Sequence, residues 1–266
     1  MSPQYVQMKD RARLAYRFDG PAEAPVVVLS NSLMSTMAMW EPQMEALTRN
    51  YRVLRHDTRG HGASDTTPGP YTIASLTDDV ITMLDELGLK QVHFAGLSMG
   101  GMIGQQLGAQ HGDRLRSLSL CDTTSEMPNR SLWEERFAAV RSGGVAALID
   151  GTIQRWFTAG FIERDPATIG RVREMIATTK EEGYLACASA VRDVNQTATL
   201  SRITTPTLII AGESDPACTV EQAQVIHREI RGSQLQVIAD AAHLSNLEQP
   251  ARFNALLTGF LASIGN

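Results

Sequence analysis

Cysteine, basic residues and long apolar runs are all scarce in this sequence, and each shortage excludes a class of protein. The three cysteines, Cys121, Cys187 and Cys218, are far apart and no pair has metal-ligand spacing, so we expect three buried free thiols. Lys and Arg number 24 against 29 Asp and Glu, with no basic cluster, which argues against nucleic acid as a partner. No apolar run approaches about 18 residues, so we expect no membrane span.

Targeting and cofactor motifs are also missing. Residues 1–5 lack the basic-then-apolar profile of a signal peptide, so we expect a cytoplasmic enzyme. No Gly-rich dinucleotide fingerprint, P-loop or metal motif is present, and we expect neither a cofactor nor a metal. The chain has 266 residues, of which 43% are hydrophobic and 20% charged. This is enough for one large α/β domain with an insertion, or for two small domains.

The strongest chemical signal lies at residues 96–101. Ser98 has a glycine two positions before it and another two positions after it. The preceding stretch, 91–95, predicts a buried strand, and the following stretch, 102–107, has apolar residues at helical spacing. This is the nucleophile-elbow pattern, a strained strand-to-helix turn in which a flanking Cβ would collide with the neighbouring chain. We predict that Ser98 is the nucleophile, because no cysteine lies in such an elbow.

Strands and helices alternate on both sides of a long helical interruption. Residues 5–17 predict two exposed antiparallel strands. Further strands are expected at 25–31, 51–57, 91–95, 116–121, 206–212 and 234–238, and helices at 40–50, 73–87, 102–107, 220–230 and 251–264. Such alternation predicts a mostly parallel sheet with helices on both faces, the α/β class.

The interruption itself contains no convincing strand. It has helical segments at 132–140, 145–157, 169–178 and 184–194. An insertion of about 75 residues is far longer than an ordinary connection. Its expected place is over the C-terminal edge of the sheet, where open α/β sheets bind ligands. We therefore expect a core made of residues 1–122 and 201–266, with a helical cap at 123–200.

A serine hydroxyl needs a base to take its proton as it attacks. Of six histidines, only His243 follows Ser98 in a loop directly after a predicted strand, and the chain order serine, acid, histidine is typical of this kind of fold. Three acids follow strand ends: Asp122, Glu213 and Asp215. We favour Asp215 as the group that orients the imidazole. Asp122 remains an alternative, or a loop or helix cap.

The oxyanion of an acyl-transfer reaction needs two backbone donors. We expect the amide of Met99, directly after the nucleophile, and the amide of Leu33, in the loop after the first buried strand. His61, in the loop 59–65, is either an element of the site or part of a tight turn.

At these residues the sequence resembles the α/β-hydrolase family, and within it the 3-oxoadipate enol-lactonases of bacterial aromatic catabolism. The resemblance covers essentially the whole chain. It rests on residues 30–33, 57–65, 68–71, 96–102, 155–158 and 243–250. It implies a triad of Ser98, Asp215 and His243. One departure is Met34, since such lactonases more often have a glycine after the leucine.

The resemblance implies a reaction, the ring opening of 3-oxoadipate enol-lactone to 3-oxoadipate through an acyl-enzyme. The substrate carboxylate then needs a cationic partner. The cap offers Arg136, Arg155, Arg171, Arg173 and Arg192. We favour Arg136 and Arg192, and expect Trp133 and Trp156 to line the pocket or to pack the cap on the core.

Three other functions stay open. One is a broad carboxylesterase, lactonase or perhydrolase on the same triad, and another is a carbon–carbon bond hydrolase. The third is a ligand receptor with a hydrolase-like pocket. The expected partner is in each case a small molecule, and the sequence does not indicate an oligomeric state.

Overall fold

The computed structural model describes residues 3–265, so the outermost residues of the two expected core segments, Met1, Ser2 and Asn266, lie outside the described chain. Eight strands form one sheet in the order β1-β2-β4-β3-β5-β6-β7-β8. They are β1 (Gln4–Gln7), β2 (Arg13–Asp19), β3 (Val26–Ser30), β4 (Arg52–His56), β5 (Val92–Leu97), β6 (Leu115–Cys121), β7 (Thr207–Gly212) and β8 (Gln234–Ile238). The predicted α/β class and each predicted strand are confirmed, but the pair predicted over 5–17 is not exposed throughout, because β2 lies between β1 and β4 and Val6, Leu14 and Ala15 are buried.

Strand direction differs between the N-terminal edge of the sheet and the rest of it. β1 and β2 pair antiparallel with each other, and β2 pairs antiparallel with β4. All other neighbours pair in parallel. Every residue of β5 and β7, in the parallel part, is buried. Strands covered on both faces must be continuously apolar, which is why these strands were readable from the sequence.

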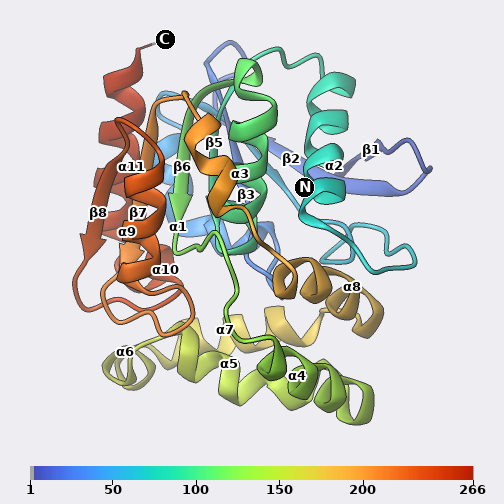
Figure 1. The fold of residues 1–266 in the computed structure, drawn as a ribbon. Helices are drawn as coiled ribbons and strands as arrows, with labels where there is room; N and C mark the ends of the chain where they lie inside the picture. The colour runs from blue at the N-terminus through green and yellow to red at the C-terminus, as the bar shows by residue number, and fades with distance from the viewer. Residues whose placement is uncertain (1–2, 266) are drawn as a thin grey trace.

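Helices cover both faces of the sheet (Figure 1). α1 (Glu41–Leu47) contacts α11 (Pro250–Ile264) on one face. On the other face, α2 (Ile73–Glu86) contacts α3 (Met99–Gln110), and α9 (Val220–Glu229) packs on β7 and β8. A capping box fixes the start of α2: Ser75 N donates to Thr72 Oγ1 and Thr72 N donates to Ser75 Oγ, both at 3.0 Å. No helix among residues 3–265 is long and apolar enough to cross a bilayer.

A group of helices lies together beyond the ends of the strands, where the arrowheads of β6 and β8 point in Figure 1. These are α4 (Arg130–Gly143), α5 (Ile149–Trp156), α6 (Ala159–Arg164), α7 (Pro166–Ala177) and α8 (Glu181–Arg192). We call this group the cap helices. The chain leaves and re-enters the core at one point, because Glu126 and Asn195 form an isolated bridge and Gln196 N donates to Ser125 O at 2.8 Å.

The cap helices differ from prediction in two places. The helix expected over 145–157 is a 3-10 turn, Val145–Leu148, followed by α5. α6 was not predicted, because six residues are too few to show a helical period. Its start is set by Thr158, whose hydroxyl accepts a hydrogen bond from Phe161 N at 3.3 Å.

Candidate active site

Ser98 lies at the junction of β5 and α3, in a tight turn that neighbouring backbone atoms approach closely. Its φ of 57° and ψ of −113° are strained for a residue with a Cβ. A Cβ on Gly96 would stand 2.1 Å from Gly100 O, and one on Gly100 would stand 2.3 Å from Ser30 O. Both flanking glycines are therefore required for the turn.

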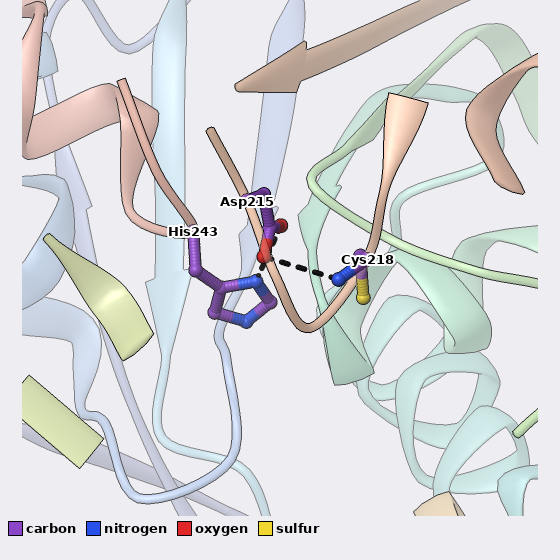
Figure 2. Close-up of side chains that lie close together, drawn as sticks. All are labelled: Asp215, Cys218 and His243. Atoms are coloured by element: carbon purple, nitrogen blue, oxygen red, sulfur yellow. Dashed lines mark hydrogen bonds and ion pairs between the residues drawn. The ribbon is translucent and has the colours of Figure 1, made fainter. Parts of the chain in front are cut away.

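His243 and Asp215 lie in direct contact. His243 Nδ1 donates to Asp215 Oδ2 at 2.8 Å, and Asp215 Oδ1 accepts from the amides of Ala217 at 2.7 Å and Cys218 at 3.0 Å (Figure 2). Both carboxylate oxygens are engaged, so the carboxylate holds one orientation of the imidazole. His243 and Ser98 line the same cavity. An imidazole held at Nδ1 has Nε2 left for a serine proton.

The electrostatics favour a basic imidazole. Burial opposes protonation of His243, but the adjacent Asp215 carboxylate outweighs it and raises the pKa of His243 above its usual value. The Trp156 ring stacks on the imidazole, with centroids 6.2 Å apart and planes 30° apart. It covers one face of the ring.

Asp122, the alternative acid, lies beside this pair. It follows β6 with a φ of 44°, and Gly212 N donates to its Oδ1 at 2.8 Å while Ser245 Oγ lies 2.6 Å from its Oδ2. Burial, reinforced by the Asp215 charge, raises the pKa of Asp122 to about 8, so this carboxyl is mostly protonated at neutral pH. Glu213, the third candidate acid, is exposed.

Leu33, in the loop after β3, lines the same cavity as Ser98. Neither Leu33 N nor Met99 N has a hydrogen-bond acceptor among residues 3–265. Met34 has a φ of 61°, the left-handed region that glycine adopts most easily. A glycine adopts this backbone conformation without strain, which is a physical reason for the glycine that such lactonases more often have at this position.

His61 is hydrogen-bonded to this loop. Its Nε2 accepts a hydrogen bond from Met34 N at 3.0 Å, and burial lowers the pKa of His61 to about 4. The ring is therefore neutral, with its proton on Nδ1. Arg59, in the same segment, is held in ion pairs with Asp79 and Asp10. The 59–65 loop thus buttresses the site through His61, while Arg59 has a structural role.

A cavity of about 510 Å³ lies between the core loops and the cap helices. Trp133, Trp156, Arg136 and Arg155 line it from the cap. The Arg136 guanidinium lies over the Trp133 ring, 4.6 Å from its centroid, and Arg155 donates to Thr152 Oγ1 at 3.0 Å. Neither arginine has a carboxylate partner among the described residues 3–265.

Partial burial makes these two charges costly. It lowers the pKa of both arginines; for Arg155, burial and then the neighbouring Arg136 lower it to about 10. Both remain charged at neutral pH. The Tyr184 hydroxyl, on α8, is buried and has no partner within the described chain. Burial raises the pKa of Tyr184 to about 12, although both guanidinium charges act to lower it. Tyr184 lies outside the lining of the cavity.

Arg192 corrects one expectation. It lies outside the lining of this cavity and pairs with Glu134 and Asp193, each at 2.7 Å. Its charge is already neutralised at the outer contact of α4 and α8. Arg173 likewise pairs with Asp150, and Arg171 binds Thr168. Arg155, next to Trp156, lines the cavity, whereas Arg192 does not.

Asp215, Cys218 and His243 could in principle approach one metal ion, since their ligand atoms lie within 4.8 Å of one another (Figure 2). The donor set does not fit a resident metal. The imidazole Nδ1 and the carboxylate bind each other, and burial with the nearby Asp215 and Asp122 raises the pKa of the Cys218 thiol well above its usual value. Metals bind the thiolate. Cys121 and Cys187 are also buried and free, as expected.

Comparison with known proteins identifies the family of this chain. Residues 25–250 match the family described as alpha/beta hydrolase fold. A relative from Acinetobacter baylyi, 3-oxoadipate enol-lactonase 2, is 38% identical over 91% of this chain and 90% of its own. The crystal structure of the enol-lactonase from Burkholderia xenovorans superposes with a TM-score of 0.95 at 38% identity, covering 97% of this chain and 100% of that one.

A hydrolase from Pseudomonas aeruginosa gives a TM-score of 0.94 at 40% identity, with 97% and 98% of the two chains covered. Fold, sequence and family match extend over nearly the whole chain. The protein therefore belongs to the α/β hydrolase family, and it is a carboxylic ester hydrolase that resembles the 3-oxoadipate enol-lactonases.

Proposed function

We propose that this enzyme opens the ring of 3-oxoadipate enol-lactone to give 3-oxoadipate in the catabolism of aromatic compounds. The observation that carries the proposal is the pairing of two kinds of group in one cavity. Ser98 and His243 line it from the core, and Arg136 and Arg155, without a protein carboxylate among residues 3–265, line it from the cap. A small substrate with both an ester and a carboxylate matches that arrangement.

Ser98, His243 and Asp215 form the proposed catalytic triad. Ser98 Oγ attacks the ring carbonyl while His243 Nε2 takes the hydroxyl proton, and Asp215 stabilises the imidazolium. The amides of Leu33 and Met99 bind the oxyanion, which is consistent with their lack of an acceptor in the described structure.

Collapse of the tetrahedral intermediate breaks the bond between the carbonyl carbon and the ring oxygen. His243 returns its proton to that oxygen, which leaves as an enol and tautomerises to the ketone. Water then attacks the acyl-enzyme, His243 takes a proton from it, and the Ser98 hydroxyl is regenerated as the second carboxylate is released. An enol leaves more easily than an alkoxide, so the chemistry suits an ordinary serine triad.

Segment 123–200 acts in this proposal as a cap that selects the substrate. Arg136 and Arg155, which line the cavity from the cap, bind the carboxylate. Trp133 and Trp156 form apolar walls. Two guanidinium groups that share one carboxylate recover part of the free energy lost by their own burial.

A matched pair of substrates tests the proposal: the enol-lactone and its side-chain methyl ester, with ring opening followed by loss of enol-lactone absorbance. An aryl acetate serves as a simple neutral ester. We expect kcat/KM to be at least about tenfold higher for the carboxylated lactone, since a charge-assisted hydrogen bond is lost in the ester. Equal values for the three compounds would instead indicate a broad esterase.

A further inference from the structure

Glu248, at the end of α10 (Ser245–Glu248), is a buried carboxylate that joins two distant parts of the chain. Its Oε2 accepts a hydrogen bond from Ala242 N at 2.9 Å. Its Oε1 accepts from Thr158 N at 3.1 Å and from the Thr158 hydroxyl. Ala242 directly precedes His243, and Thr158 lies between α5 and α6 of the cap helices.

A second contact runs in parallel with the first. Leu244 N donates to Trp156 O at 3.1 Å, and the Trp156 ring stacks on His243. The residues on both sides of His243 are therefore bound either to the cap or to the carboxylate that holds the cap. Arg155 is one residue before Trp156, so the same segment carries a proposed carboxylate ligand.

The neighbours of Glu248 in α10 bind elsewhere. Ser245 Oγ lies against Asp122, and Asn246 Nδ2 donates to Met39 O at 2.9 Å and to Gln43 Oε1 at 3.1 Å. These contacts tie the histidine loop to the core. Of the α10 polar side chains, Glu248 is the one that binds Thr158, between α5 and α6.

We propose that Glu248 is a positioning residue that fixes the 155–158 segment of the cap to the histidine loop. It thereby keeps the carboxylate ligand Arg155 and the catalytic base His243 at a fixed relative position. This inference rests on the proposed function, because it assigns the selective role to the cap. The consequence is that substrate selectivity depends on a residue outside the cavity lining.

The chemistry of the contact requires a carboxylate. The two oxygens of Glu248 face two backbone amides and a hydroxyl, all of which donate. An ionised carboxylate accepts at both oxygens, whereas a carboxamide has one oxygen and one NH₂ group. In Glu248→Gln, the NH₂ group therefore faces at least one backbone donor, and one amide loses its acceptor.

Two variants separate the two ends of the contact. Thr158→Val removes the hydroxyl that donates to Glu248 at the cap end, and with it the acceptor for Phe161 N at the start of α6, while the bond from Thr158 N stays. We expect kcat/KM for the carboxylated lactone to fall about tenfold or more, mainly through KM. Hydrolysis of the neutral methyl ester should change much less, because it does not use Arg155. Glu248→Gln also disturbs Ala242, so it should lower kcat for both substrates as well as the preference between them.

Matched controls identify a merely structural effect. Thr158→Ser keeps the hydroxyl and should restore the preference for the carboxylated lactone. Thr72→Val removes a threonine hydroxyl that caps α2, where it accepts from Ser75 N at 3.0 Å, and it should leave the preference unchanged. Because Thr158 and Glu248 act through one contact, the double variant should lose little more than Glu248→Gln alone.

The outcomes distinguish the two claims. If the wild type does not prefer the carboxylated lactone, the proposed function fails. If the wild type does prefer it, and folded Thr158→Val and Glu248→Gln keep that preference, the positioning role of Glu248 is overturned. A parallel loss with both substrates in Thr158→Val, together with a lowered unfolding temperature, would also overturn it in favour of a general stabilising contact.

Discussion

Arginines removed from solvent have carboxylate partners in the core, but two of those in the cap have none in the described chain. In the core, Arg55 pairs with Asp19 and Glu41, each at 2.7 Å, and Arg59 pairs with Asp10 at 2.6 Å and Asp79 at 2.5 Å. In the cap, the half-buried Arg136 and Arg155 have no carboxylate partner among residues 3–265. The residue type is the same, but the core arginines are more deeply buried and paired, and the two cap arginines have no carboxylate partner within that part of the chain.

The difference separates structural charge from functional charge. A charge removed from water is costly unless it is paired, so a paired arginine needs no ligand. An unpaired one keeps its attraction for an anion that arrives later, and such residues gather at functional sites. In the proposed function, the core therefore provides a fixed scaffold for the chemistry, and the cap provides selectivity.

The largest effect is expected at Asp215, on the core side. Asp215→Asn should lower kcat for carboxylated and neutral substrates alike by about 10³–10⁴-fold, since the imidazole loses its orientation and the stabilisation of its charged form. Asp122→Asn should stay within about tenfold of wild type, because Asp122 does not contact the imidazole. Steady-state kinetics of the two variants test this; the reverse ranking would make Asp122 the triad acid.

The arginines provide the direct contrast between core and cap. Arg155→Met and Arg136→Met should each raise KM for the carboxylated lactone by about 10–100-fold, with the neutral ester unaffected. Neither should lower the free energy of unfolding. Arg59→Met leaves Asp79 buried and unpaired, and should destabilise the fold by about 3–5 kcal/mol. Kinetics and urea denaturation of the three variants would contradict the division if all lost stability equally.

Asp122 gives the core a pH-dependent stability. Its pKa is raised from 3.8 to about 8 in the folded chain, so the folded state binds a proton that the unfolded state has released between those values. Stability from this group is therefore present at low pH and falls as the pH rises through that window. Asp122→Asn lacks this dependence. Urea denaturation at pH 5 and pH 8 should show wild type losing stability relative to the variant; an unchanged difference would contradict the assignment.

The smallest effect is expected at the thiol beside the triad. Cys218→Ala and treatment with EDTA should each leave kcat/KM within about twofold of untreated wild type, because the Cys218 thiol has a raised pKa and Asp215 and His243 bind each other. Loss of activity with EDTA, restored by Zn²⁺, would show that this group of ligands holds a metal after all.

Local patterns explain what could be predicted. The bounds of β8 follow from a short segment in which Leu235, Val237 and Ile238 lie between turn residues, and the glycines around Ser98 follow from steric crowding that any elbow shares. The sequence also indicated Asp215 and His243, because each follows a strand and the order along the chain is fixed. Signals of this kind are local, and the structure reproduces them.

Pairing between distant segments could not be predicted. The sequence offered five cap arginines and favoured Arg136 and Arg192, but the partners in the structure change that choice: Glu134 and Asp193 neutralise Arg192, whereas Arg155 has no such partner in the described chain. The contact of Glu248 with Thr158 spans 90 residues. Nothing in the spacing of either residue indicates the other.

The central claim is that Ser98 forms a covalent acyl-enzyme with the lactone, and rapid-quench mass spectrometry of the intact protein tests it most directly. Because the leaving enol stays attached to the acyl group, we predict a transient adduct with the full mass of one lactone, on the peptide that contains Ser98. Ser98→Ala should form no adduct and lose at least about 10³-fold in rate. Turnover by Ser98→Ala at the wild-type rate, with no adduct in either protein, would contradict the account.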